Sequence, residues 1–284
     1  MNAQKLVLSD EVAALRDLVD PVERVKNATD LLSRFQDAVT EVSSIRREAI
    51  AELLKQGRSQ TEVARLVGLT RGRIGQIAVS GPPPERAFLG TGMITVAIAL
   101  KQEAETGRYA VAREDFEAAL RLKELAASLQ LETVFEEIPP PGMLDLNRDN
   151  LLVICGPRLS PLIKQVLDAD PVLRFVAAER GWSLRDRHTG NEHRSLMDLD
   201  PPQSGDVGYL GRLPRLDGKG TFLYIAGIHA MGSSGVMHFL EHELTAIYKE
   251  VRTRRFSAII GCDFDPDTGH VTASRRLTPF YRHD

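Results

Sequence analysis

The chain has 284 residues, of which 43% are hydrophobic and 26% are charged, and its formal net charge is -3. This length accommodates one large domain or two smaller ones, and the composition excludes a wholly disordered protein. No stretch approaches the ~18 consecutive apolar residues of a membrane helix, and the N-terminus has no apolar signal core. Cys155 and Cys262 are the only cysteines, each within an apolar run. We therefore expect a cytoplasmic protein with two reduced, buried thiols and no membrane partner.

Residues 10–80 have the apolar spacing of helices almost throughout. Asp20 and Pro21 are typical of an N-cap followed by a first-turn proline, and Gly57 is typical of a C-terminal cap. The long helix predicted between them has few partners within a small module. This favours a homodimer formed through the helix, and the alternative is that the helix folds back on its own domain.

A basic segment follows the first part of this helix. Residues 46–76 contain seven basic and three acidic side chains and lie between acidic flanks. Such an island is typical of a small nucleic-acid-binding module, although a solvated helix face produces the same pattern. Charge alone does not separate the two interpretations.

Two short helices are predicted inside the basic segment. Ser59 and Glu62 have the spacing of a capping box for the first helix, Gly68 ends it, and Thr70 caps the second. The positions expected to face inward are Val63, Ala64, Val67, Ile74 and Ile77, with Leu69 at the corner between the helices. The outward positions of the second helix are Arg71, Arg73 and Gln76. These residue types contact phosphates and base edges in the major groove of DNA.

This segment resembles the helix-turn-helix of bacterial sigma factor region 4 and of the actinobacterial regulators that contain it. The matching positions are Ser59, Glu62–Ala64, Gly68–Arg71, Arg73–Ile74 and Gln76–Ile77. The resemblance implies binding to double-stranded DNA through Arg71, Arg73 and Gln76, with Arg58 and Thr70 beside them. Gly72 and Gly75 depart from it, because each costs a helix ~1 kcal/mol relative to alanine and removes a base-reading side chain. No core-binding sigma region precedes the motif, so we expect a regulator rather than a sigma factor. The alternative is a helical hairpin that only packs.

A proline-rich linker at 81–86 separates this helix-turn-helix module, residues 1–80, from an α/β domain at 87–284. Short apolar strands alternate with helices after the linker. Strands are expected at 93–100, 133–138, 151–155, 173–178, 182–186, 221–228, 256–264 and 271–281, and helices at 113–129, after 155 through 166, and from about 234 to 251. The alternation predicts a Rossmann-like domain with a mostly parallel sheet, and thus an α+β two-domain chain.

Two segments of this domain share a strand, a glycine-containing loop and a helix. The candidate ligand-binding residues are Gly156, Arg158 and Ser160 in the first and His229, Gly232, Ser233 and Ser234 in the second. Loops of this kind bind anions at the carboxyl ends of parallel strands, and an arginine adds a cation for phosphate or carboxylate. The alternative is that the glycines and serines only turn and cap the chain.

Two further patterns in the sequence could indicate metal binding or catalysis. The stretch from His238 to His242 matches the inverted zinc motif HxxEH, but no glutamate follows Glu250 to act as third ligand, so no metal is expected. The acidic pair Glu114 and Asp115 is compatible with hydrolysis or cation binding. No nucleophile–base pair can be identified, so we assign no catalytic residue and no cofactor.

The leading hypothesis is a DNA-binding transcriptional regulator that senses a small anionic, nucleotide-like ligand. The alternatives are a nucleotide-processing enzyme localised to DNA and a ligand-free assembly domain.

Overall fold

The structure is a computed structural model that describes residues 3–177 and 181–283. The chain forms two compact units, an N-terminal unit that extends to Pro84 and a C-terminal unit from Glu85 onward. No helix in the described part of the chain is long and apolar enough to cross a membrane. Ala178, the last residue of one expected strand, lies outside the described residues.

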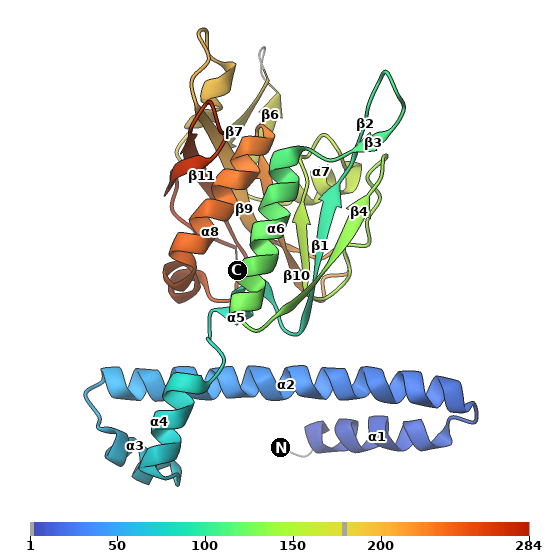
Figure 1. Ribbon diagram of the computed structural model, residues 1–284, viewed down its shortest axis with the longest axis vertical. Coiled ribbons are helices and arrows are strands. Elements are labelled where there is room, and N and C mark those ends of the chain that lie inside the picture. Colours follow the sequence, from blue (N-terminus) through green and yellow to red (C-terminus); the bar gives the residue numbers. More distant parts are fainter. Residues whose placement is uncertain (1–2, 178–180, 284) are drawn as a thin grey trace. The chain divides into compact units, whose positions relative to one another are not determined.

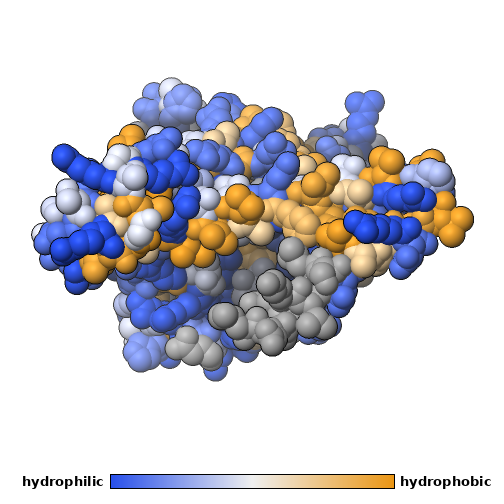
Figure 2. Space-filling view, turned by 90° about the horizontal axis from the view of Figure 1, so that it is seen from below, coloured by the Kyte–Doolittle hydropathy of each residue, from blue (hydrophilic) through white to orange (hydrophobic). Residues whose placement is uncertain are grey.

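The N-terminal unit is entirely helical (Figure 1). Its helices are α1 (Ala3–Asp17), α2 (Pro21–Lys55), α3 (Gln60–Val67) and α4 (Arg71–Ser80). The expected cap of α2 is confirmed, because the side chain of Asp20 accepts a hydrogen bond from the Val22 amide at 3.0 Å. α2 packs against both α1 and α4, yet apolar side chains stay exposed along this unit (Figure 2).

The α3–turn–α4 segment has the predicted local structure. Ser59 and Glu62 form the capping box of α3, Gly68 adopts a left-handed conformation at φ 70°, and the Thr70 side chain caps α4. A small apolar core contains Ile50, Val63, Ala64, Ile74 and Ile77.

Two expectations for this segment are wrong. Val67 was expected to face inward and Leu69 to fill the corner between the helices, but their exposed fractions are 47% and 37%. The physical reason is that α2 covers this core through Ile50, Leu53 and Leu54, and the core that they form with α3 and α4 includes neither Val67 nor Leu69. Apolar area is therefore left open beside the turn.

The C-terminal unit is built on one eight-stranded sheet, in the order β12-β11-β9-β10-β5-β1-β4 with β13 also on β11. The parallel strands are β1 (Met93–Ala99), β4 (Glu132–Ile138), β5 (Leu151–Ile154) and β10 (Thr221–Gly227). The antiparallel strands are β9 (Gly205–Pro214), β11 (Phe256–Phe264), β12 (Val271–Arg276) and β13 (Tyr281–Arg282). The expected mixed α/β class is confirmed, and the parallel arrangement belongs to the four strands that helices or long crossovers connect.

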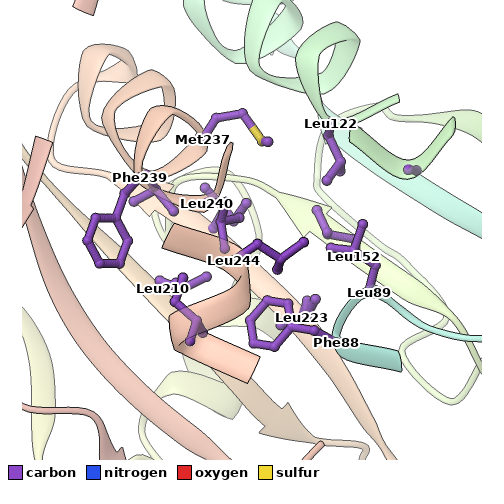
Figure 3. Packing of buried hydrophobic residues seen from close by; sticks show 14 of the residues in the cluster. Phe88, Leu89, Leu122, Leu152, Leu210, Leu223, Met237, Phe239, Leu240 and Leu244 are labelled. Carbon is purple, nitrogen blue, oxygen red and sulfur yellow. The ribbon is translucent and has the colours of Figure 1, made fainter. Parts of the chain in front are cut away.

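Both faces of the sheet are covered. α6 (Arg113–Ser128) and α8 (Ala230–Val251) lie side by side on one face (Figure 1), where Leu122 and Leu240 pack against Leu152 and Leu223 (Figure 3). The other face packs against α7 (Pro161–Leu167) and a small antiparallel sheet. That sheet consists of β6 (Leu173–Ala177), β7 (Trp182–Asp186) and β8 (Glu192–Arg194). The remaining elements are α5 (Arg86–Leu89), the hairpin of β2 (Lys101–Gln102) and β3 (Tyr109–Ala110), and the 3-10 helix Leu196–Asp198.

Cys155 and Cys262 are both buried and unpaired, as expected. Cys155 directly follows β5, and Cys262 lies in β11 against the start of α8, since its sulfur is 3.6 Å from the Met231 carbonyl oxygen. Both thiols act as small apolar side chains in the core.

Strand β9 was missed by the sequence analysis, which assigned no element to residues 191–220. Its glycines at 205, 208 and 211 have the composition of a loop, but β9 is central in the sheet and pairs with both β10 and β11. A Cβ atom added to Gly208 would come within 2.5 Å of the Gly232 carbonyl oxygen on α8. Gly208 is therefore required because α8 crosses the strand there at backbone distance.

We expect Gly208→Ala to lower the free energy of unfolding by about 3 kcal/mol, because the new methyl group meets backbone atoms that cannot rotate away. Urea unfolding followed by circular dichroism measures the change. Gly156→Ala is the matched control, since a Cβ there has no neighbour within 4 Å. Equal unfolding midpoints for the two variants would contradict the close packing of β9 against α8.

Candidate functional site

A cavity of about 350 Å³ lies at the carboxyl ends of three parallel strands, β1, β5 and β10. It is lined by Lys101, Asp115, Gly156, Arg158, Leu159, Gly227, Ile228, His229, Ala230 and Ser233. The next strand of this sheet along the chain after β1 is β4, which pairs on one side of β1, whereas β5 pairs on the other. The cavity thus lies at the point where strand order reverses, the usual place for a ligand in an open α/β sheet.

The two glycine-containing loops from the sequence analysis meet at this cavity. Gly156 and Arg158 come from the loop after β5, and His229 and Ser233 come from the loop and first turn after β10. They meet because β5 and β10 are adjacent and parallel. The structure therefore brings four of the seven candidate ligand residues together.

The other three candidates do not line the cavity. The Ser160 hydroxyl is buried, donates to the Gly142 carbonyl at 2.6 Å and caps α7. Gly232 packs against β9, and its amide donates inside the protein. The Ser234 hydroxyl donates to the Glu114 carbonyl, and Ser234 lies on a separate hollow between α6, α8 and the loop after β11. These residues support the backbone of the site and are unavailable to a ligand in the cavity.

The N-terminus of α8 is already capped by the protein itself. Oδ2 of Asp206, on β9, accepts hydrogen bonds from the amides of His229 at 3.1 Å and Gly232 at 2.6 Å. This cap explains why α8 begins at Ala230 and not near Ser234 as expected. Burial raises the pKa of Asp206 from 3.8 to about 6, against the lowering effect of its hydrogen bonds and of His229. The position that an anion would take at this helix is therefore filled by a side chain.

His229 is held at the edge of the cavity by a second carboxylate. Its Nε2 atom lies 2.8 Å from Oδ1 of Asp198, the last residue of the 3-10 helix. The ring is about one-third exposed, and the Asp198 side chain is 18% exposed. The arrangement orients the imidazole at the edge of the cavity.

Two cations face the cavity from the segments that follow β1 and β5. Lys101 follows β1, and the Arg158 guanidinium lies 6.0 Å from the centre of the Trp182 ring. Within residues 3–177 and 181–283, neither Lys101 nor Arg158 forms an ion pair. The aromatic face orients Arg158 without neutralising it. The cavity therefore keeps positive charge for an anionic ligand.

One carboxylate lies among these cations. Asp115, in the first turn of α6, is 8% exposed, and burial is the main cause that raises its pKa. The Ser233 hydroxyl hydrogen-bonds to it, and the same hydroxyl accepts the Gly227 amide at 3.2 Å. Asp115 thus links α6 to the first turn of α8.

Four residues of the site were not assigned to it from the sequence. Lys101 follows directly on a correctly predicted strand, so the position of ligands at strand ends was a usable signal for it. Asp115 was noticed only as half of an acidic pair. Asp198 and Asp206 had no signal, because the segment that carries them was taken as a loop.

The N-terminal unit presents the candidate nucleic-acid residues to solvent. Arg58, Thr70, Arg71, Arg73 and Gln76 are all exposed. Arg73 donates to Gln76 at 2.6 Å, so the two side chains lie together on one face of α4. The Thr70 hydroxyl is occupied by the Arg73 amide at 3.2 Å.

The HxxEH stretch lies on the surface of α8. The rings of His238 and His242 stack with centroids 4.2 Å apart, and their Nδ1 atoms contact the Ser274 hydroxyl and the His238 carbonyl. Burial, together with His242 and Arg121, lowers the pKa of His238. In the part of the chain that the structure describes, no group of three metal-ligating side chains comes together.

We expect Asp206→Asn to flatten the pH dependence of stability between pH 4 and 7. The folded pKa of Asp206 lies above its unfolded value, so the buried charge weakens the fold progressively as pH rises through this range. An asparagine keeps an oxygen for the two amides of α8 and has no charge to bury. Between pH 4 and pH 7, the free energy of unfolding of the variant should rise by about 2–3 kcal/mol relative to that of the wild type. Urea titrations at each pH measure this gain, with the exposed Asp267→Asn as control, and parallel profiles for all three proteins would contradict it.

Comparison with known proteins assigns this chain to no family. No protein-family model, no curated protein and no solved structure matches it. Its function must therefore be inferred from the geometry and charge of its own residues.

Proposed function

We propose that the protein is a cytoplasmic, DNA-binding transcriptional regulator whose α/β unit binds a small anionic ligand. The main observation is the α3–turn–α4 segment, in which both helices are capped and their apolar side chains form one core. Arg71, Arg73 and Gln76 remain exposed on α4. A helix-turn-helix places its second helix in the major groove, where these residue types read bases and contact phosphates.

The glycines of α4 favour tight docking with limited base readout. A Cβ on Gly72 would meet nothing within 4 Å, so its small size is not needed for internal packing. A bare backbone lets the helix approach a phosphate or the groove floor closely, at ~1 kcal/mol of helix stability per glycine. Phosphate contacts would then carry a large part of the affinity and make it depend on salt.

The cavity of the C-terminal unit supports the part of the proposal that concerns ligand binding, which we call the ligand arm. Lys101 and Arg158 line the cavity and provide positive charge, and Asp115 is the carboxylate on the same wall. A ligand alters DNA affinity only if it binds the DNA-competent and DNA-incompetent states with different affinities. The proposal therefore requires that occupancy of the cavity changes the DNA-binding equilibrium.

A homodimer is the proposed assembly. The exposed apolar side chains of α2 are Val22, Val25, Leu32, Val39, Val42 and Ile45, each more than half exposed. Val25, Leu32 and Val39 recur every seven residues, the repeat with which two helices pack in a coiled coil. A second copy of α2 presents the same repeat and covers this stripe symmetrically.

One observation favours enzymatic action as a second candidate. His229 is oriented by Asp198 at 2.8 Å beside the cavity, which is the arrangement of a general base with its positioning carboxylate. Turnover of a nucleotide panel, lost in His229→Ala, would favour the enzyme over the sensor.

For DNA binding, we expect Arg71→Ala/Arg73→Ala to weaken duplex affinity by about 30-fold or more, as two lost contacts of 1–3 kcal/mol each imply. Fluorescence anisotropy with labelled promoter DNA at several salt concentrations measures both the affinity and the salt slope. The matched control is Arg16→Ala/Lys26→Ala, which removes the same charge from α1 and α2. Equal binding by the two double variants would show that α4 does not contact DNA.

For assembly, we expect the wild-type protein to sediment as a dimer at micromolar concentration and Leu32→Glu/Val39→Glu to sediment as a monomer. Two charges on each helix would face each other across a desolvated seam. Leu216→Glu is the control, since Leu216 is an exposed apolar residue of the C-terminal unit. A monomeric wild-type protein would remove the dimer from the proposal.

A further inference from the structure

We propose that the cavity binds a phosphorylated ribosyl compound, with the phosphate at Arg158 and Lys101 and the ribose hydroxyls at Asp115. This inference rests on the proposed ligand arm and specifies its chemistry. It is carried by the placement of two cations and one buried carboxylate around a single cavity.

The phosphate end is defined by side chains and not by a helix terminus. Asp206 already accepts the amides of His229 and Gly232 at the start of α8, so a phosphate there would meet a carboxylate in place of free N–H groups. Arg158 lies on the loop after β5 and Lys101 begins β2 just after β1, and β5 and β1 are adjacent. A phosphate at this switch point can contact both cations, with a planar guanidinium fork from Arg158.

The sugar end is defined by Asp115. Its side chain is hydrogen-bonded to Ser233, and the charge of the nearby Lys101 lowers its pKa against the effect of burial. A carboxylate on the wall of a cavity repels a bare polyanion but accepts hydrogen bonds from neutral donors. A vicinal diol offers two such donors, and its hydroxyl groups would replace the water that burial removes from Asp115.

The size of the cavity fits this class of ligand. Its volume of about 350 Å³ is at the lower end of the range typical of small-molecule sites. A monophosphate with one sugar, with or without a base, fills a site of this size better than a dinucleotide does. The cavity therefore favours a mononucleotide or a pentose phosphate.

The test is isothermal titration calorimetry of the full-length protein with AMP, ribose 5-phosphate, inorganic phosphate and 2′,3′-dideoxy-AMP. Fluorescence of Trp182, the single tryptophan of the chain, gives a second readout because its ring stacks on Arg158. We expect AMP and ribose 5-phosphate to bind at least tenfold more tightly than the other two ligands. Asp115→Asn should weaken AMP at least tenfold and leave 2′,3′-dideoxy-AMP within twofold of wild type.

Controls separate the sugar contact from the phosphate contact. Arg158→Ala should weaken all four ligands at least tenfold, whereas Glu124→Gln, an exposed change on α6, should bind as wild type does. The comparison of AMP with its dideoxy analogue uses the wild-type protein and needs no variant to fold. Equal affinity for these two ligands, or an unchanged AMP affinity in Asp115→Asn, would overturn the assignment of the ribose and leave the anion site standing. No binding of any phosphorylated compound would remove the ligand arm of the proposed function itself.

Discussion

The carboxylate of Asp206 is the contact on which the C-terminal unit's site depends. It reaches from β9 to the first turn of α8 and accepts two amides there. The Ile228 amide also donates to the Val207 carbonyl at 2.8 Å, so the loop after β10 is tied to β9 on both sides of His229. A buried charge is costly, but here it satisfies helix donors that would otherwise lack partners. The position of every cavity residue on that loop follows from this attachment.

A helix that is capped from within changes how the cavity can be used. The usual anion site of an α/β fold, the amides at a helix N-terminus, is occupied by Asp206, so positive charge must come from Arg158 and Lys101. Asp115 adds a hydrogen-bond acceptor on the same wall. A ligand of the proposed class would therefore place its charged and its neutral parts at different positions in the cavity. Asp198 fixes His229 in addition, which leaves little freedom in the loop.

The N-terminal unit buries few side chains and leaves much apolar surface exposed. Its α3–α4 core contains few buried side chains, while Val67, Leu69 and the stripe on α2 leave apolar area exposed. A core of this size gives limited stability, so association through α2 would contribute to folding as well as to symmetry. A symmetric dimer would also present two copies of α4, as DNA with two half-sites requires.

Local signals in the sequence determined the elements whose ends are made by neighbouring residues. The caps at Asp20, Ser59 and Thr70 are hydrogen bonds between residues a few positions apart, so the sequence alone predicts them. The same holds for β5 and β10, whose continuous apolar runs indicate burial on both faces, and for the loops that follow them.

The tertiary structure decided what depends on partners far apart in the chain. β9 has the composition of a loop, but Gly208 in it is required by the backbone of α8, which lies far away in the sequence. The roles of four other residues also depend on contacts with distant parts of the chain. Asp206 caps α8, Asp115 lines the cavity, and Ser160 and Gly232 pack inside the protein. Val67 and Leu69 stayed exposed, since periodicity shows which face of a helix is apolar but not whether another element covers it.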